Sequence, residues 1–329
     1  MDIGKLFKKL PNKYYSHKFK DLSVDSRKCK LNDIFFSIKG VKKNGNKFIN
    51  HAIETGAKTI VSDLNFQGKK ENILFIKNNS VRKLVSEIAS KFYKKKPNNL
   101  IAITGTNGKS SIASFYFQIL NNSKLKVATI GTLGIKTNNS NQLTENTTLD
   151  PISIHKTLSL LKRKKITNTI LEASSHGLKQ HRLDGLRFDT AIFTNLSRDH
   201  LDYHKTYKDY FNSKLILFNK LTKKGGNIIY DNDISQSKIL KKICIKKNFK
   251  SLTIGKKNSD LIIKSHEYVG NLQKIEIEFK RKKYSFATNL IGKIQVKNIL
   301  FAILAASKSK IKFSKIIQSI SDIKPVEGR

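Results

Sequence analysis

The chain has 329 residues, of which 38% are hydrophobic and 9% aromatic, and this length and composition exclude a peptide hormone and an intrinsically disordered chain and suggest two folded domains. Lys and Arg number 64 against 24 Asp and Glu, a formal net charge of +40. The lysines are spread from Lys5 to Lys324, whereas nucleic-acid-binding proteins usually cluster their basic residues in one patch with interleaved aromatic residues. The spread indicates a solvated surface. A biased base composition of the genome would produce the same enrichment in lysine.

The sequence gives no sign of export or membrane insertion. The longest apolar run, 299–306, is far shorter than the roughly 18 residues of a membrane helix. The first ten residues lack the apolar segment of a secretory signal, and the two cysteines, Cys29 and Cys244, form no disulfide framework or CxxC site. We therefore expect a cytoplasmic protein with no membrane or nucleic-acid partner, and a monomer.

The first ninety residues predict a small mixed α/β domain. Short apolar runs indicate strands at 33–38, 59–62 and 73–76, and amphipathic spacing indicates helices at 48–56 and 81–93. The polar run 94–99, which contains Pro97, ends the second helix. We place the first domain at residues 1–97.

From residue 100 onward, strands and helices alternate. Strands are expected at 100–104, 127–131, 169–173 and 191–194, with helices at 112–120, 152–161 and 207–217. This alternation predicts a mostly parallel sheet with helices on both faces. The alternating runs 261–268, 272–279 and 284–290 predict an antiparallel addition, and helices at 296–307 and 313–320 follow. The predicted fold class is α/β, with a P-loop-type central domain at 98–322.

A glycine turn follows the first of these strands. Gly105 and Gly108 allow successive backbone N–H groups and a helix N-terminus to surround phosphate oxygens. Lys109 can then neutralise the outer phosphates, and the Ser110 hydroxyl can ligate magnesium. Ile103 stands where the general P-loop pattern has glycine, so the loop is a variant, and a glycine turn without a ligand is the alternative.

Two further strands end in polar residues. Glu172 ends an apolar strand, and because ligands of parallel sheets lie outside the carboxyl ends of the strands, it can join Ser110 as a magnesium ligand. A salt bridge at the strand end is its alternative role. Asp199 or His200, after the next strand, can reach the same place, although each histidine of this segment could instead lie on the surface or cap a helix.

Taken together, these motifs resemble the ATP-dependent Mur ligases of peptidoglycan synthesis, and within that family the MurE type. The matching segments are 24–27, 33–36, 104–110, 145–148, 172–178, 180–182, 195–204 and 328–329. The Thr-Gly-Thr-Asn-Gly-Lys loop is specific to the superfamily, whereas 174–178 and 196–204 point to the MurE type.

The resemblance implies an amide-forming reaction. ATP phosphorylates the γ-carboxylate of UDP-N-acetylmuramoyl-L-alanyl-D-glutamate. The amine of a diamino acid then attacks the acyl phosphate, giving an amide, ADP and phosphate. We expect meso-2,6-diaminopimelate as the acceptor, although lysine stays open. Because phosphoryl transfer depends on positioning and charge neutralisation, a loop, a lysine and magnesium ligands suit this chemistry.

The resemblance also assigns roles to individual residues. It gives ATP the residues Gly105, Thr106, Asn107, Gly108, Lys109, Ser110 and Ser111, with Asn298 at the adenine. Its catalytic set is Lys109, Glu172, His200 and Lys214, and its Mg²⁺ ligands are Ser110, Glu172, His200 and carbamylated Lys214. For the UDP-sugar peptide it implies Ser26, Asn146, Thr147, Thr148, Ser174, Gln180 and Arg182. From the residues alone, Lys214 reads as one solvated helix lysine among many; as a carbamate it becomes an oxygen anion that can help hold magnesium.

Some features depart from the family pattern. Ser111 replaces a frequent threonine, Gln295 replaces an asparagine, and the loop 41–45 is unusually basic. Mur ligases have a third, C-terminal domain. We expect residues 323–329 to be the start of the linker that leads to it. We therefore expect a fragment of a longer ligase that binds nucleotide yet turns over poorly by itself.

Two alternatives compete with this interpretation. Another member of the superfamily, such as a folylpolyglutamate synthase, is disfavoured by the first domain and by the segment 25–27. A basic P-loop protein that binds nucleic acid is the alternative from a different class, motivated by the charge alone.

Overall fold

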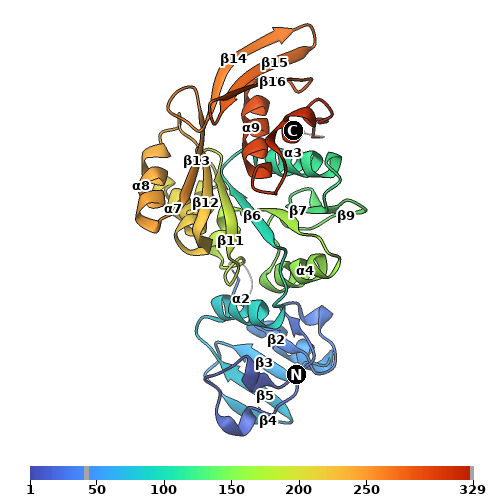
Figure 1. Cartoon of the computed structure of the whole chain (residues 1–329). Coiled ribbons are helices and arrows are strands. Elements are labelled where there is room, and N and C mark those ends of the chain that lie inside the picture. Colours follow the sequence, from blue (N-terminus) through green and yellow to red (C-terminus); the bar gives the residue numbers. More distant parts are fainter. Residues whose placement is uncertain (41–43, 327–329) are drawn as a thin grey trace. The chain divides into compact units, whose positions relative to one another are not determined.

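The computed structural model describes residues 1–40 and 44–326 (Figure 1). It divides into two compact units. The first comprises residues 1–94, 150–159 and 180–185, and the second comprises 95–149, 160–179 and the chain from 186 onward. Residues 41–43 of the basic loop and the Gly328-Arg329 motif lie outside the described residues. Within the described ranges, no helix has the length and apolar character needed to cross a bilayer.

The first unit is built on a five-stranded sheet in the order β1-β2-β3-β5-β4. Its strands are β1 (Leu22–Ser23), β2 (Ile34–Phe36), β3 (Thr59–Ser62), β4 (Gly68–Lys70) and β5 (Ile73–Lys77), with only β4 pairing antiparallel among these strands. Its helices are α1 (Ile49–Glu54) and α2 (Val81–Phe92), with short 3₁₀ turns at Ile3–Lys5, Asn12–Tyr14, Ser26–Lys28 and Gly45–Phe48.

Alternation along β2 and β3 explains why helices cover this sheet on both faces. Successive strand side chains point to opposite faces, so Ile34 and Val61 join a core with α2, while Phe35 and Ile60 join a second core with α1. The apolar residues of α2 recur at helical spacing and are buried or partly buried in this core. The predicted strands and helices of this region are all present.

The second unit contains an eleven-stranded sheet in the order β16-β15-β14-β13-β12-β11-β6-β10-β7-β8-β9. Parallel pairing links β6 (Asn99–Thr104), β7 (Val127–Gly131), β10 (Asn168–Glu172), β11 (Phe188–Phe193), β12 (Thr222–Asp231), β13 (Lys250–Gly255) and the start of β14 (Leu261–Val269). Antiparallel pairing adds β15 (Leu272–Phe279) and β16 (Lys282–Thr288) at one edge, and β8 (Gly134–Thr137) and β9 (Ser140–Gln142) at the other. The predicted α/β class, with a mostly parallel sheet and antiparallel additions, is confirmed.

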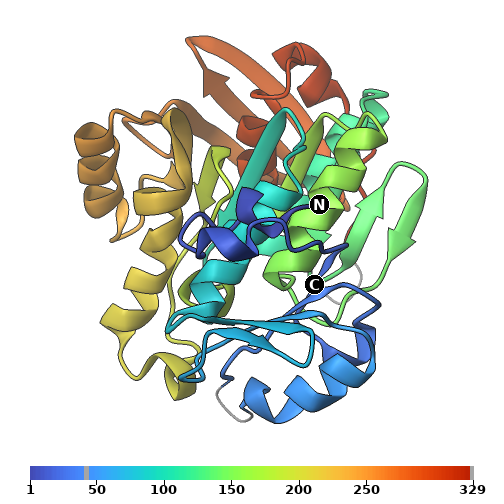
Figure 2. The ribbon, with the colours of Figure 1, turned by 90° about the horizontal axis from the view of Figure 1, so that it is seen from below.

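Helices α3 (Lys109–Asn122) and α9 (Lys293–Ala306) supply much of the core of this unit. Nearly every residue of α9 from Val296 to Ala306 is buried, which explains the apolar run without a membrane. The remaining helices are α5 (Ser175–Lys179), α6 (Leu201–His204), α7 (Tyr207–Ile216), α8 (Ser237–Lys247) and α10 (Phe313–Gln318), with a π-helical turn at Leu217–Leu221. Helix α4 (Pro151–Arg163) belongs to the first unit up to residue 159 and to the second unit from residue 160. The β8–β9 hairpin (light green) and strands β14 to β16 (orange) can be followed in Figure 2.

Strand register brings the loops that follow four strands together at the carboxyl ends of those strands. Glu172 pairs with Ile103, Leu171 with Ile130, and Phe193 with Thr104. The carboxyl ends of β6, β7, β10 and β11 therefore lie next to one another, which is where a doubly wound sheet binds its ligands.

Candidate functional site

The loop between β6 and α3 requires glycine at two positions. Gly105 has φ +150°, and a Cβ there would lie 1.9 Å from Thr194 Oγ1. Gly108 has φ +86° and immediately precedes α3, and its Cβ would lie 2.5 Å from Asn298 Oδ1. Neither backbone conformation nor space admits a larger residue. Thr194 Oγ1 donates to the Asn107 carbonyl at 2.7 Å, so the neighbouring strand end helps to hold the loop in shape.

Two lysine side chains converge on this loop. Lys109 Nζ donates to the carbonyl oxygens of Gly105 and Thr106 at 2.9 and 2.7 Å. Lys214 Nζ, from α7, donates to the same Gly105 oxygen at 2.9 Å and lies 4.2 Å from the Tyr210 ring centre. Burial, reinforced by the positive charge of Lys109, lowers the pKa of Lys214 to about 6. The Lys214 amine is therefore mainly neutral at pH 7.

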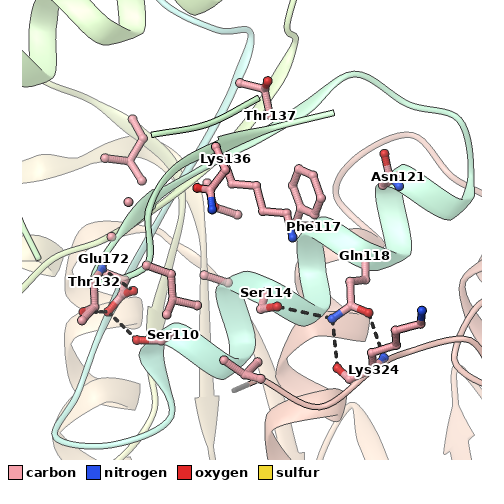
Figure 3. Close-up of a pocket in the computed structure, with 18 of the residues that line it drawn as sticks. Ser110, Ser114, Phe117, Gln118, Asn121, Thr132, Lys136, Thr137, Glu172 and Lys324 are labelled. Carbon is pink, nitrogen blue, oxygen red and sulfur yellow. Dashed lines mark hydrogen bonds between the residues drawn. The ribbon is translucent and has the colours of Figure 1, made fainter. Parts of the chain in front are cut away.

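A buried carboxylate lies beside the start of α3. Glu172 is 2% exposed, and its Oε2 accepts hydrogen bonds from Ser110 Oγ and Thr132 Oγ1, both at 3.1 Å. Its Oε1 accepts from the Thr132 backbone N–H at 3.0 Å. A Cβ at Gly131 would lie 2.2 Å from Oε1, so the absence of a side chain there makes room for the carboxylate. Figure 3 shows Ser110, Thr132 and Glu172 grouped in this way.

Hydroxyl groups surround the end of β10. Thr148 Oγ1 donates to the Glu172 carbonyl at 2.9 Å and accepts from the Ser174 backbone N–H at 3.0 Å. Thr147 Oγ1 lies 3.0 Å from Thr132 Oγ1. Three predicted substrate residues, Thr147, Thr148 and Ser174, thus lie within one hydrogen-bonded group around Glu172.

Three histidine rings form a cluster. The His176 ring centre lies 4.9 Å from that of His200 and 5.4 Å from that of His204. His204 is fully buried, and its Nε2 lies 2.9 Å from Ser175 Oγ. Burial, together with the nearby His176 and Lys179, lowers the pKa of His204 to about 4. This ring is therefore neutral at pH 7.

Many of these groups line one polar cavity of about 350 Å³. Its walls are Thr106, Asn107, Gly108, Lys109, Ser110, Ser111, Thr132, Thr147, Glu172, Ser174, Ser175, Asp199, His200, Tyr210 and Lys214. A second cavity of about 790 Å³ shares Ser110, Thr132 and Glu172 with it and extends between α3 and the β7–β8 turn (Figure 3). Within the described residues, no group of three or more His, Cys, Asp or Glu side chains is placed to hold a metal ion.

Several other predicted residues do not line this cavity. Asn298 is buried against Gly108, and its Nδ2 donates to Gln295 Oε1 at 3.1 Å. Asn146 is exposed and does not line the cavity. Ser26, Gln180 and Arg182 belong to the first unit; Arg182 donates to Gln180 Oε1 from Nε and Nη2, at 3.2 and 2.9 Å.

Comparisons with known proteins identify the family of this fold. Residues 103–306 match the Mur ligase middle domain, and residues 18–93 match the Mur ligase family catalytic domain. The chain belongs to the Mur ligase family. A protein named UDP-N-acetylmuramoyl-L-alanyl-D-glutamate--2,6-diaminopimelate ligase, from Rickettsia montanensis, is 38% identical over 320 residues, which cover 96% of this chain and 66% of that protein. A protein of the same name from Chelativorans sp. is 34% identical over 308 residues, which cover 94% of this chain and 64% of that protein.

Solved structures extend the comparison. A structure of the ligase of that same name has a TM-score of 0.88 at 25% identity, covering 100% of this chain and 68% of the other. A folylpolyglutamate synthase (FPGS) complex with AMPPCP has a TM-score of 0.59 at 14% identity and covers 73% of this chain and 67% of the other, a likeness of fold alone. The chain spans about two thirds of the length of the curated relatives described above.

The predicted site residues did not include every residue of the cavity. Thr132, Ser175 and Tyr210 line it but were not among the predicted site residues. Thr132 could have been found, since it directly follows a predicted strand and the carboxyl ends of parallel strands share an edge. Tyr210 carries no comparable signal, because its place depends on how α7 packs.

Proposed function

We propose that this chain forms the nucleotide-binding and UDP-sugar-binding part of an ATP-dependent ligase that joins 2,6-diaminopimelate to UDP-N-acetylmuramoyl-L-alanyl-D-glutamate in peptidoglycan synthesis. One observation carries the proposal above the others: the glycine loop, Lys109, the Ser110–Glu172 pair and Lys214 line a single polar cavity. Substrate and acceptor are those in the names of the relatives. In this proposal, residues 1–97 contribute to UDP-sugar binding and 98–322 bind ATP.

The residues fit a magnesium–nucleotide complex. Ser110 and Glu172 offer hard oxygen donors 3.1 Å apart, of the kind that Mg²⁺ prefers, and they lie beside a loop whose N–H groups suit phosphate. They would hold one ion, while His200 and a modified Lys214 would hold a second. Bound magnesium would neutralise phosphate charge during transfer. Lys109 would exchange its two carbonyl partners for the outer phosphates.

Lys214 suits modification by CO₂. A carbamate forms when a neutral amine attacks the carbon of CO₂, making an N–C bond and releasing one proton. The lowered pKa of about 6 keeps this amine neutral at pH 7. The product is an anion, so the reaction would place a negative charge next to Lys109, where it could help to hold a cation. A carbamate signal in ¹³C NMR after addition of ¹³C-bicarbonate, absent from Lys214→Met, is expected.

The substrate residues are assigned by chemistry and family likeness. Hydroxyl and amide groups of Ser26, Asn146, Thr147, Thr148, Ser174 and Gln180 are proposed to bond the diphosphate and peptide. Arg182, oriented by Gln180, is proposed to pair with a phosphate or carboxylate through its planar fork. Asn298 is proposed to face the adenine from beneath Gly108.

Calorimetry and a ligation assay test the proposal. The chain is titrated with ADP and Mg²⁺, and product is then sought with ATP, the UDP-muramoyl dipeptide and either diaminopimelate or lysine. In the calorimetric titration, we expect the wild-type chain to bind ADP and Lys109→Ala to bind it with an affinity at least tenfold lower. Where the assay detects ligation, we expect more product with diaminopimelate than with lysine. A folded wild-type chain without affinity for adenine nucleotides would refute the proposal.

A further inference from the structure

The Glu172 carboxylate lies in the wall shared by two cavities. Ser110, Thr132 and Glu172 line both the 350 Å³ cavity of the glycine loop and the 790 Å³ cavity beside α3 (Figure 3). The terminal torsion of a glutamate is broad and roughly two-fold, so the rotamer preference of the side chain does not by itself fix the plane of the carboxylate. The orientation of the two oxygens therefore depends mainly on hydrogen-bond donors.

Thr132 supplies two of these donors. Its backbone N–H reaches Oε1 at 3.0 Å and its hydroxyl reaches Oε2 at 3.1 Å, so one residue holds both oxygens of the carboxylate. The pairing of β7 with β10 places it there, because Leu171 is in register with Ile130. Ser110 adds a third bond, to Oε2, but its hydroxyl is also the proposed magnesium ligand.

The Thr132 hydroxyl also contacts a residue of the proposed substrate set. Thr147 Oγ1 lies 3.0 Å from Thr132 Oγ1. A hydroxyl has one proton and two lone pairs, so when Thr132 donates to Glu172 it accepts from Thr147. A directed chain of hydrogen bonds then runs from Thr147 through Thr132 to Glu172.

We propose that Thr132 is a positioning residue that sets the orientation of the Glu172 carboxylate for a divalent cation. This inference rests on the proposed nucleotide-binding function. Groups that orient a metal ligand typically contribute about one to two orders of magnitude to metal affinity. Without the hydroxyl, Glu172 keeps the backbone bond to Oε1, while Oε2 loses its Thr132 donor and the carboxylate can rotate.

The test measures cation affinity directly rather than turnover. Mn²⁺ is titrated into the protein with ADP, and free Mn²⁺ is followed by its electron paramagnetic resonance signal. We expect Thr132→Val to weaken Mn²⁺ binding about tenfold, and Thr132→Ser, which keeps the hydroxyl, to restore it to within about twofold. Thr137→Val is the matched control, because this threonine ends the neighbouring strand β8 and its hydroxyl, among the described residues, bonds within the β8–β9 turn.

Two outcomes separate this inference from the function on which it rests. Wild-type protein that binds neither ADP nor Mn²⁺ would refute the proposed function. Wild-type protein that binds both, with Thr132→Val equally tight, would refute the role of Thr132 alone. Thr132 is exposed, so the variants should fold. If circular dichroism shows that Thr132→Val does not, Thr132→Ala decides the question by the same tenfold criterion.

Discussion

Lys214 combines a buried amine with a lowered pKa of about 6, whereas an unfolded lysine has a pKa near 10.4. Between these values the unfolded chain binds more protons, so this residue makes wild-type stability rise with pH. We predict that in CO₂-free buffer the free energy of unfolding of Lys214→Met, relative to wild type, is highest near pH 6 and declines toward pH 10. Urea unfolding at four pH values checks this.

The control for this experiment is Lys220→Met, which changes an exposed lysine after the same helix. A decline with pH that is seen for Lys214→Met and not for this variant would assign the pH dependence to Lys214. Stability curves for Lys214→Met that run parallel to wild type would show that the Lys214 amine titrates normally.

Gly131 leaves no spare room beside Glu172. An alanine Cβ would lie 2.2 Å from Oε1 and 2.6 Å from Cδ, so the carboxylate must move away from Thr132. We predict that Gly131→Ala lowers the free energy of unfolding by about 1–3 kcal/mol and weakens Mn²⁺–ADP binding. Gly225→Ala provides the comparison. Apart from its chain neighbours, no atom of the described residues lies within 4 Å of the position that a Cβ would take there, so only backbone strain of about 1 kcal/mol is expected. Equal Mn²⁺ affinity in both variants would contradict the argument.

At the scale of elements, α3 connects the phosphate loop to a distant segment. Gln118 of α3 accepts from the Lys324 backbone N–H at 2.8 Å and donates to the Lys324 carbonyl at 3.1 Å (Figure 3). We predict that Gln118→Leu, which removes both bonds, speeds amide exchange at Lys324 about tenfold, because each bond contributes roughly 0.5–1.5 kcal/mol. Hydrogen–deuterium exchange measures this.

Gln118→Glu distinguishes the two bonds. Its carboxylate can still accept from the Lys324 N–H but has no proton for the carbonyl, so exchange should lie between wild type and Gln118→Leu. Protection at Lys324 that is the same in all three proteins would mean that the segment is held by other contacts.

Local sequence patterns predicted the elements around the phosphate loop and missed others for identifiable reasons. β6 and α3 have continuous apolar or helical spacing, and both are present. β12 was not predicted, because Lys-Lys-Gly-Gly occupies its first half and these residues are not typical of strands. Its second half is buried. The contact between Thr132 and Glu172 joins residues 40 apart in sequence, and it becomes visible only when β7 is paired with β10.

At the scale of the whole molecule, the compact units are not continuous stretches of the chain. The sequence-based domains are continuous, whereas residues 150–159 and 180–185 pack with the first unit in the structure. Within that unit, Lys156 donates to Asp21 at 2.8 Å and Ser90 to the Gly185 carbonyl at 2.9 Å. Contacts of this kind join segments that are distant in the sequence, and local sequence patterns do not predict them.

The net charge of +40 acts on the folded chain as a whole. Basic residues so outnumber acidic ones that most cannot have an acidic partner, and like charges destabilise the compact state by repulsion. Salt screens exposed charges over about 10 Å at 0.1 M. We therefore predict that the melting temperature rises as NaCl increases from low concentration to about 0.3 M, as measured by scanning calorimetry.

The same rise could come from chloride occupying the phosphate loop, so the measurement is repeated on Lys109→Ala. Screening of charge spread over the surface predicts an equal rise in this variant, because one of 64 basic residues is removed. Loss of the rise would place the salt effect at the loop, and a melting temperature that falls with salt would mean that attractive pairs outweigh the excess of positive charge. A spread charge also predicts weak binding to duplex DNA at physiological salt, since binding of that kind depends on the number of phosphates neutralised together.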